Sequence, residues 1–145
     1  MKIGKYEMPD ELYYNKGHCW ARIQDDIAEI GYDHFGERLA GPIKNVELLD
    51  EEDLIAQNEP FGTLSSGKWA GKLESPVSGE ILEVNEDIVN NPQKINENPY
   101  SSWLVKIKLE DTGEIDKLMK GGSESLQNWL NSEISQFEAK GYKWE

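Results

Sequence analysis

Between Cys19 and Leu109 the sequence is a series of short apolar segments separated by glycine, proline and acidic turns. Several segments are rich in β-branched and aromatic residues or alternate between apolar and polar positions, as strands do. They are CWARI, IAEIGY, IKNVELL, PFGTLSS, AGKLES, EILEVN and WLVKIKLE. In the last of these, Val105, Ile107 and Leu109 share one face and Leu104 takes the other. The pattern predicts a sheet-rich centre.

Three stretches interrupt these predicted strands. DHFGERLAG predicts a short helix that ends at Gly41 and Pro42. DEEDLIAQNEP predicts an acidic connector, and EDIVNNPQKINENPY predicts a short helix or loop broken by Pro92 and Pro99. PVSG predicts a turn, in which Gly79 is free to adopt a positive φ.

After Leu109 the apolar spacing becomes helical. TGEIDKLMK predicts one short helix, which Gly121 and Gly122 end. Ser123 is an N-cap candidate for a second helix whose apolar stripe is predicted to face the core. The stripe consists of Leu126, Trp129, Leu130, Ile134 and Phe137. The fold class predicted for the chain is α+β and sheet-dominated, one domain over residues 1–145 with a C-terminal helical segment at 110–145.

Composition excludes several partner classes. The 28 acidic and 15 basic residues give a net charge of −13, which nucleic acid and anionic membranes would repel. No apolar run is long enough for a signal peptide or a membrane span. The single cysteine, Cys19, allows no internal disulfide and agrees with a reducing compartment. We expect a cytoplasmic, monomeric protein.

The stretch GTLSSGKW partly matches the phosphate-binding loop G-x-x-x-x-G-K-[ST]. That loop binds phosphate because its glycines open onto a helix N-terminus. Here Trp69 replaces the hydroxyl residue, and Gly71, Pro76 and Gly79 follow within eleven residues, so no helix is expected. The alternative is a β-hairpin with Lys68 near its tip and Gly67 in the turn. An exposed lysine at such a tip is ordinarily only a solvated charge.

The sequence segments around Lys68 indicate that this lysine has a specific role. The segments FGTLSSGKW, SPVSGEILEVN, NPQKINENPYSSWLVKIKL and HCWARI…IAEIGYDHFGERLAG resemble, in the same order, the H protein of the glycine cleavage system. The similarity covers about residues 13–119. It implies a lipoyl-domain-like barrel-sandwich hybrid with short helices. His18 and Trp20 match the His-Glu-Trp segment of the family, with Cys19 in place of the glutamate.

The resemblance implies a carrier, not an enzyme. Lys68 falls on the lysine that carries lipoic acid through an amide bond, with Gly67 and Trp69 beside it, and Gly79 falls on a glycine that lipoylating enzymes favour. The implied partners are a pyridoxal-phosphate glycine decarboxylase, an aminomethyltransferase and dihydrolipoyl dehydrogenase, besides a lipoate ligase or lipoyl transferase. Trp69 is predicted to pack on the hairpin; the alternative is that it covers the apolar stem of the arm.

The modified site departs from the family pattern Glu-Ser-Val-Lys-Ala. Ser65 replaces the acidic residue that helps lipoylating enzymes recognise the site, and Trp69 follows the lysine. This leaves open a different attachment enzyme. It also leaves open an H-like lipoate-binding protein that serves heterodisulfide-reductase-like subunits in sulfur oxidation. A non-modified interaction module is the alternative of another class.

Other site chemistries find little support in the sequence. His18, His34, Cys19 and Asp33 follow no metal-ligand spacing, so we expect no metal. A Cys–His hydrolase would need Cys19 and a histidine on one face, whereas neighbouring residues of a strand point to opposite faces. A biotin carrier would place methionines beside the lysine, where this chain has Gly67 and Trp69.

Overall fold

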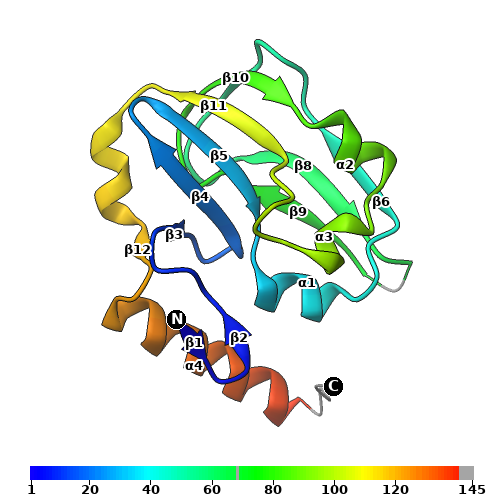
Figure 1. Ribbon diagram of the computed structural model, residues 1–145, viewed down its shortest axis with the longest axis vertical. Helices are drawn as coiled ribbons and strands as arrows, with labels where there is room; N and C mark the ends of the chain where they lie inside the picture. Colours follow the sequence, from blue (N-terminus) through cyan, green and yellow to red (C-terminus); the bar gives the residue numbers. More distant parts are fainter. Residues whose placement is uncertain (68, 141–145) are drawn as a thin grey trace.

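The computed structural model describes residues 1–67 and 69–140. Its larger sheet is antiparallel, with strand order β12-β3-β4-β5-β11-β10-β7 (Figure 1). These strands are β3 (Tyr13–Tyr14), β4 (Cys19–Gln24), β5 (Ile27–Tyr32), β7 (Leu54–Ile55), β10 (Gly79–Val84), β11 (Val105–Leu109) and β12 (Met119–Lys120). The central strands of this sheet come from the alternating segments of the sequence.

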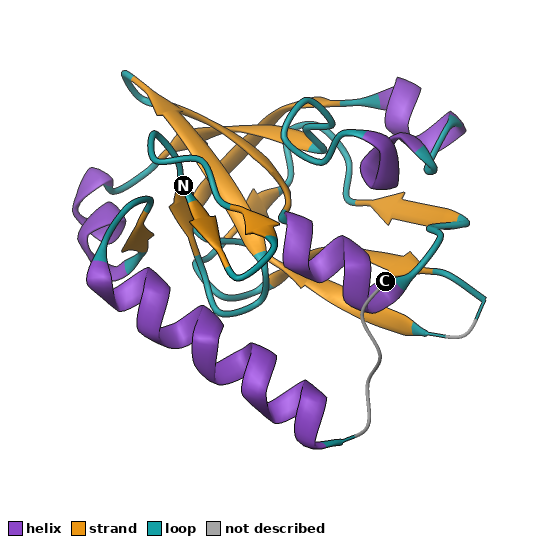
Figure 2. Ribbon diagram, turned by 60° about the horizontal axis from the view of Figure 1, so that its bottom comes forward, coloured by secondary structure: helices purple, strands orange, loops and turns teal. Residues whose placement is uncertain are grey.

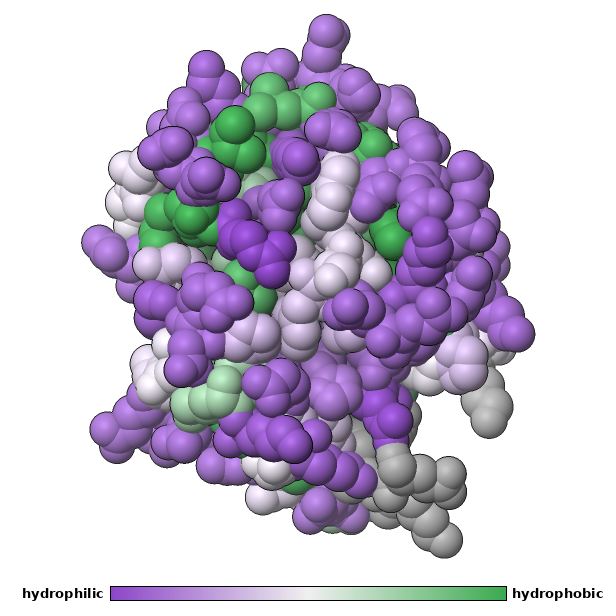
Figure 3. Space-filling model, viewed as in Figure 1, coloured by the Kyte–Doolittle hydropathy of each residue, from purple (hydrophilic) through white to green (hydrophobic). Residues whose placement is uncertain are grey.

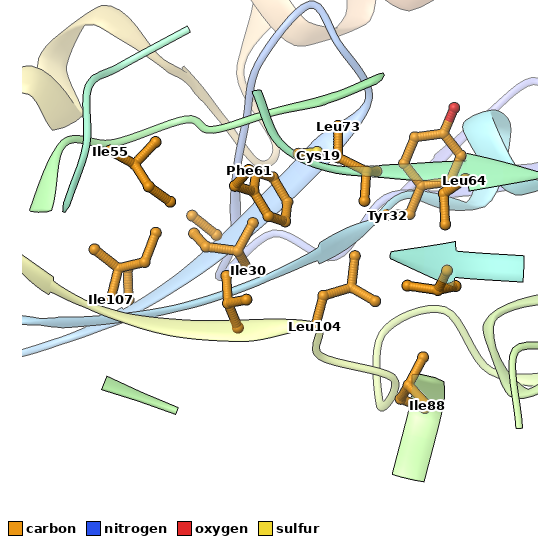
Figure 4. Packing of buried hydrophobic residues seen from close by; sticks show 14 of the residues in the cluster. Cys19, Ile30, Tyr32, Ile55, Phe61, Leu64, Leu73, Ile88, Leu104 and Ile107 are labelled. Atoms are coloured by element: carbon orange, nitrogen blue, oxygen red, sulfur yellow. The ribbon is translucent and has the colours of Figure 1, made fainter. Parts of the chain in front are cut away.

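A smaller antiparallel sheet has the order β6-β8-β9. Its strands are β6 (Asn45–Leu48), β8 (Pro60–Ser65) and β9 (Ala70–Glu74). Figure 4 shows Phe61, Leu64 and Leu73 from this sheet pointing toward Ile30 and Ile107 of the larger one. All five side chains are buried. The two sheets therefore enclose one apolar core, and the sheet-dominated sandwich expected from the sequence is confirmed.

Short helices close the sandwich. The helix α1 (His34–Ala40) begins at Asp33, whose carboxylate accepts a hydrogen bond of 2.7 Å from the Gly36 amide, and it ends at Gly41 with φ 80°. The proline-broken stretch forms two helices, α2 (Glu86–Asn90) and α3 (Lys94–Glu97). The predicted bounds are right for α1, and the later stretch is more regular than the sequence indicated.

Two short strands were missed. β7 lies inside the stretch that we predicted to be only an acidic connector, and β12 follows a 3₁₀ helix, η1 (Thr112–Lys117), where one short helix was predicted. Each strand has two residues and exists because a neighbouring strand pairs with it: β10 pairs with β7, and β3 with β12. A strand of two residues is too short to show an alternation of apolar and polar positions, so the sequence of the strand does not reveal it.

The C-terminal helix α4 (Glu124–Ala139) begins at Ser123, whose hydroxyl accepts a hydrogen bond of 3.2 Å from the Leu126 amide. It packs against a ribbon formed by β1 (Lys2–Ile3) and β2 (Tyr6–Glu7) (Figures 1 and 2). Leu126 and Leu130 are buried in a second apolar cluster, and the other predicted stripe residues pack on it. The core-facing stripe is thus confirmed.

None of the helices within residues 1–67 and 69–140 is both long enough and apolar enough to cross a membrane.

Candidate functional site

Strands β8 and β9 form the hairpin that the sequence predicted around Lys68. The strands pair from Pro60 opposite Glu74 to Ser65 opposite Ala70. Beyond that pair the Ser66 amide donates a hydrogen bond of 2.8 Å to the Trp69 carbonyl, which closes the turn. A strand, and not a helix, follows the turn, so the segment lacks the helix N-terminus that a phosphate-binding loop requires.

Lys68 itself lies outside the described residues, so its place at the tip stays a prediction. Its neighbours define the space available there. Gly67 has φ 91°, a value that favours glycine, and a Cβ built on it would meet no heavy atom within 4 Å. Glycine is therefore used here for its backbone angle and not because of crowding. The space beside the Gly67 backbone is therefore open.

Trp69 packs along its own strand. A Cβ on Gly71 would lie 2.4 Å from the Trp69 ring, so the ring occupies the space that the missing side chain leaves. The ring is nevertheless 40% exposed. Packing on the hairpin agrees with the interpretation we favoured, while coverage of an attached arm by the same ring stays a prediction. No pattern in the sequence indicated that Gly71 makes room for the ring.

A shallow depression of about 460 Å³ lies beside the turn, lined by Lys44, Asn45, Ser65, Gly67, Trp69 and Ala70. The Lys44 amide donates to the Ser65 carbonyl at 2.8 Å, which holds this edge of the hairpin against the start of β6. No carboxylate is among the lining residues, because Ser65 stands where the family pattern has an acid. The electrostatic surroundings of the turn therefore differ from those that the family pattern implies.

Gly79 does not use the positive φ that a turn would allow, and its match to the glycine that lipoylating enzymes favour stays a prediction. It is the first residue of β10 and is not among the residues with positive φ, so the turn does not use its conformational freedom. A Cβ at this position would lie only 2.0 Å from the Lys108 carbonyl oxygen on β11. The glycine is needed because two strands approach closely, a reason that becomes visible only when β11 is in place.

The histidines and the cysteine serve the fold. His18 is buried between Asp33 and Glu133, with Nδ1 3.4 Å from Asp33 Oδ2 and Nε2 3.1 Å from Glu133 Oε1. Burial alone would lower the pKa of His18, but the two carboxylates outweigh it and raise the pKa to about 9. His34 Nδ1 accepts a hydrogen bond from the Glu7 amide at 3.0 Å. Sequence reasoning missed the His18–Asp33–Glu133 contact.

Cys19 lies in the main core, whereas the His18 ring stacks beside Phe35 and Trp129 in the second cluster. Burial, followed by the charge of Asp33, raises the pKa of the Cys19 thiol, which makes it a poor nucleophile. The described part of the chain contains no group of three or more His, Cys, Asp or Glu side chains arranged to hold a metal ion.

Two packed sheets with a protruding, open hairpin define the class of lipoyl-domain-like sandwich folds. A family model described as glycine cleavage H-protein matches residues 12–130. The chain therefore belongs to the glycine cleavage H-protein family. Proteins of this family are carrier subunits and not catalysts, and they hold lipoic acid covalently on a lysine.

Individual relatives agree with this assignment. A glycine cleavage system H protein of Halothermothrix orenii is 42% identical over 124 residues, 85% of this chain and 95% of the relative. A probable glycine cleavage system H protein 3 of Sulfurisphaera tokodaii is 40% identical over 118 residues, which are 81% of this chain and 84% of the relative. A crystal structure of the H protein of Mycobacterium marinum superposes with a TM-score of 0.76 at 26% identity, covering 86% of this chain and 99% of that one.

Proposed function

We propose that this chain carries a lipoyl group on Lys68 and shuttles an aminomethyl group and reducing equivalents among the glycine cleavage enzymes. The observation that carries the proposal is the open turn at the end of the β8–β9 hairpin, where Gly67 and Trp69 flank the one lysine that matches the modified position of the family. The relatives described above are named for glycine cleavage, and the sulfur-oxidation alternative has no support among them.

The scaffold contributes position and reach. The β8 arm of the hairpin is paired with β6, and Phe61, Leu64 and Leu73 anchor both arms in the core, so the arms that lead to the turn are fixed to the sandwich. A bound lipoyl group would supply a disulfide that accepts a group as it is reduced. Tethering that group to one protein raises its concentration at each partner's active site into the millimolar range (about 1 mM or more). The chain itself then needs no general acid or base.

The partners in this proposal are glycine decarboxylase, the aminomethyltransferase and dihydrolipoyl dehydrogenase, and the compartment is the cytoplasm. Attachment falls to a lipoate ligase or lipoyl transferase, because lysine amines are ordinarily protonated at neutral pH and an enzyme must activate them for acylation. Whether the enzyme accepts Ser65 in place of the family's acidic residue decides how efficiently the carrier is loaded.

The test is the intact mass of protein purified from its own cells, followed by peptide mapping. We expect the added mass of one lipoyl group on the peptide that contains Lys68. Lys68→Arg should abolish the modification and the transfer activity while leaving the fold intact, because guanidinium is too poor a nucleophile. Lys72→Arg, a matched change in the exposed part of β9, should leave both unchanged. Unmodified Lys68 in every native copy would refute the proposal.

A further inference from the structure

A groove on the surface lies between β6 and α2. It has a volume of about 570 Å³ and combines an apolar lining with carboxylates. The apolar lining comes from both sheets and from α2: Val46, Leu48, Leu49, Val84 and Val89. The carboxylates are Glu47, Asp50, Glu51 and Glu86. In the view of Figure 1 these elements lie at the right, where Figure 3 shows mostly hydrophilic side chains with apolar ones between them.

The groove carboxylates differ from neighbouring ones in their partners. Next to Glu86 on α2, Asp87 forms an ion pair of 2.6 Å with Lys94, and on β10 the Glu83 carboxylate lies 3.8 Å from Lys106. Across residues 1–67 and 69–140, none of the four groove carboxylates has an ion-pair partner. No lysine or arginine lines the groove either.

Unpaired acids alone would say little in a chain with 28 acidic and 15 basic residues. The informative feature is that these four line the same groove as five apolar residues, of which Leu49 remains 40% exposed. A groove that combines apolar surface with charge of one sign favours a ligand with an apolar anchor and charge of the opposite sign. A second copy of the chain does not meet this requirement, since each copy has a net charge of −13.

The walls of the groove are held in place before any partner arrives. The Leu49 amide donates to the Phe61 carbonyl at 3.0 Å, and the Asp50 amide donates to Asp53 Oδ2 at 2.8 Å. The loop that follows is fixed to β10, because the Glu52 amide donates to the Ile81 carbonyl at 2.8 Å. A groove that is already formed avoids part of the entropy loss on binding.

The groove also lies within reach of the hairpin. β6 pairs with β8 from Asn45 opposite Ser65 to Leu48 opposite Gly62, so the strand that lines the groove runs from the turn. At about 3.3 Å per residue, Glu47 lies only about 7 Å along the strand from the pair beside the turn. A protein seated in the groove would therefore have its surface close to the group carried on the turn.

We infer that this groove docks a partner protein through a basic segment with an apolar anchor, that is, lysine or arginine residues beside a leucine or aromatic side chain. The inference rests on the proposed function only in naming the glycine cleavage enzymes as partners. The apolar anchor occupies the groove between β6 and α2, and the basic side chains pair with the four carboxylates. Electrostatic attraction then speeds the encounter, and the anchor sets the lifetime of the complex.

The groove is tested first with synthetic peptides, which do not require a lipoyl group. The probe carries Leu-Phe between two lysine pairs, and matched peptides replace Leu-Phe by Gly-Gly or the lysines by glutamate. In a backbone NMR titration at low salt we expect saturable binding of the probe, with shifts concentrated at residues 46–51 and 84–89. The Gly-Gly peptide should bind about tenfold more weakly, and the glutamate peptide should not bind.

The variant Glu47→Lys with Glu51→Lys should weaken binding of the probe about tenfold or more. Its control is Glu110→Lys with Asp116→Lys, which makes the same change in net charge at exposed positions outside the groove and should change affinity by less than about twofold. Shifts spread over the whole acidic surface, equal effects of the two variants, or no saturable binding would each overturn the inference.

The same variants, lipoylated to the same extent by intact mass, are then assayed with each glycine cleavage enzyme. We expect KM for at least one enzyme to rise about tenfold in the groove variant with kcat unchanged, and added salt to bring wild-type KM toward that value. If the peptide binds in the groove but none of these enzymes loads the lipoylated protein, the proposed function is refuted and the docking groove is not. Normal loading with identical KM values for both variants would refute the groove.

Discussion

His18 and Glu133 are 115 residues apart in the sequence, and their side chains meet with Nε2 3.1 Å from Oε1. The contact joins the segment before β4 to α4. On the other side of the His18 ring, Nδ1 lies 3.4 Å from Oδ2 of Asp33, which is fully buried. The family model ends at residue 130, so Glu133 lies in the part of α4 beyond it. The part of α4 beyond the matched residues is therefore tied to the sandwich by a part-buried charge contact.

Glu133→Gln should lower the free energy of unfolding by about 1–2 kcal/mol at neutral pH, because a hydrogen bond to a charged partner is lost. Urea unfolding followed by tryptophan fluorescence measures the change, and Trp129 next to His18 makes the signal sensitive to this region. The control is Glu138→Gln, an exposed position on the same helix. Equal stability of the two variants would show that the contact contributes nothing.

The His18 contact also predicts how stability depends on pH. The folded pKa of about 9 lies above the usual 6.5, so the charged ring stabilises the fold fully below pH 6.5 and this contribution disappears as the pH rises through 9. We expect wild type to lose about 2–3 kcal/mol over that interval relative to His18→Gln. Unfolding curves of both proteins from pH 6 to pH 10 give the difference, and parallel pH profiles would contradict the prediction.

Gly79→Ala should destabilise the fold by about 1–3 kcal/mol, since the new methyl group overlaps a backbone oxygen and β10 must move away from β11. Gly17→Ala is a suitable control, because its Cβ would meet neighbours at ordinary distances of 3.4 Å or more and its φ is not positive. Thermal unfolding compares the two. Equal midpoints would mean that the strands at Gly79 separate without loss of stability.

The elements that the sequence predicted are those whose signals are local. The strand β11 alternates between buried and more exposed positions, and the Ser123 cap, Leu126 and Leu130 lie within two helical turns of one another. What was missed depends on contacts between distant segments. Gly79 is required because the Lys108 carbonyl oxygen leaves no room for a Cβ, and the Trp69 ring fills the space that Gly71 leaves without a side chain. The strand β7 forms only because it pairs with β10. The groove combines residues from two separate segments, 46–51 and 84–89, so no single window of the sequence contained it.

Ser65→Glu should speed lipoylation by a ligase that recognises the family's acidic residue three positions before the lysine. Ser65 is half-buried in β8 beside the turn, and its carbonyl already accepts the Lys44 amide, a main-chain bond that the substitution keeps. Ser65 lines one depression that contains Lys44 and no acid, and a second one that contains Glu47 and Lys72, so the new carboxylate would have lysines as well as one acid in its surroundings. We expect the initial rate to rise about tenfold, roughly the effect of one well-placed ionic contact.

Time-resolved intact mass with a purified ligase gives that rate, and Ser101→Glu, which adds the same charge at an exposed position outside the hairpin, is the control. A rise in Ser65→Glu alone would mean that recognition depends on where the charge lies. An equal rise of the lipoylation rate in both variants would point to general electrostatic attraction of the ligase. No rise in either would show that the ligase recognises the turn without an acidic residue at position 65. Because the Ser65 side chain contributes only a contact of 3.4 Å with Asn45, the substitution changes recognition with little effect on the fold.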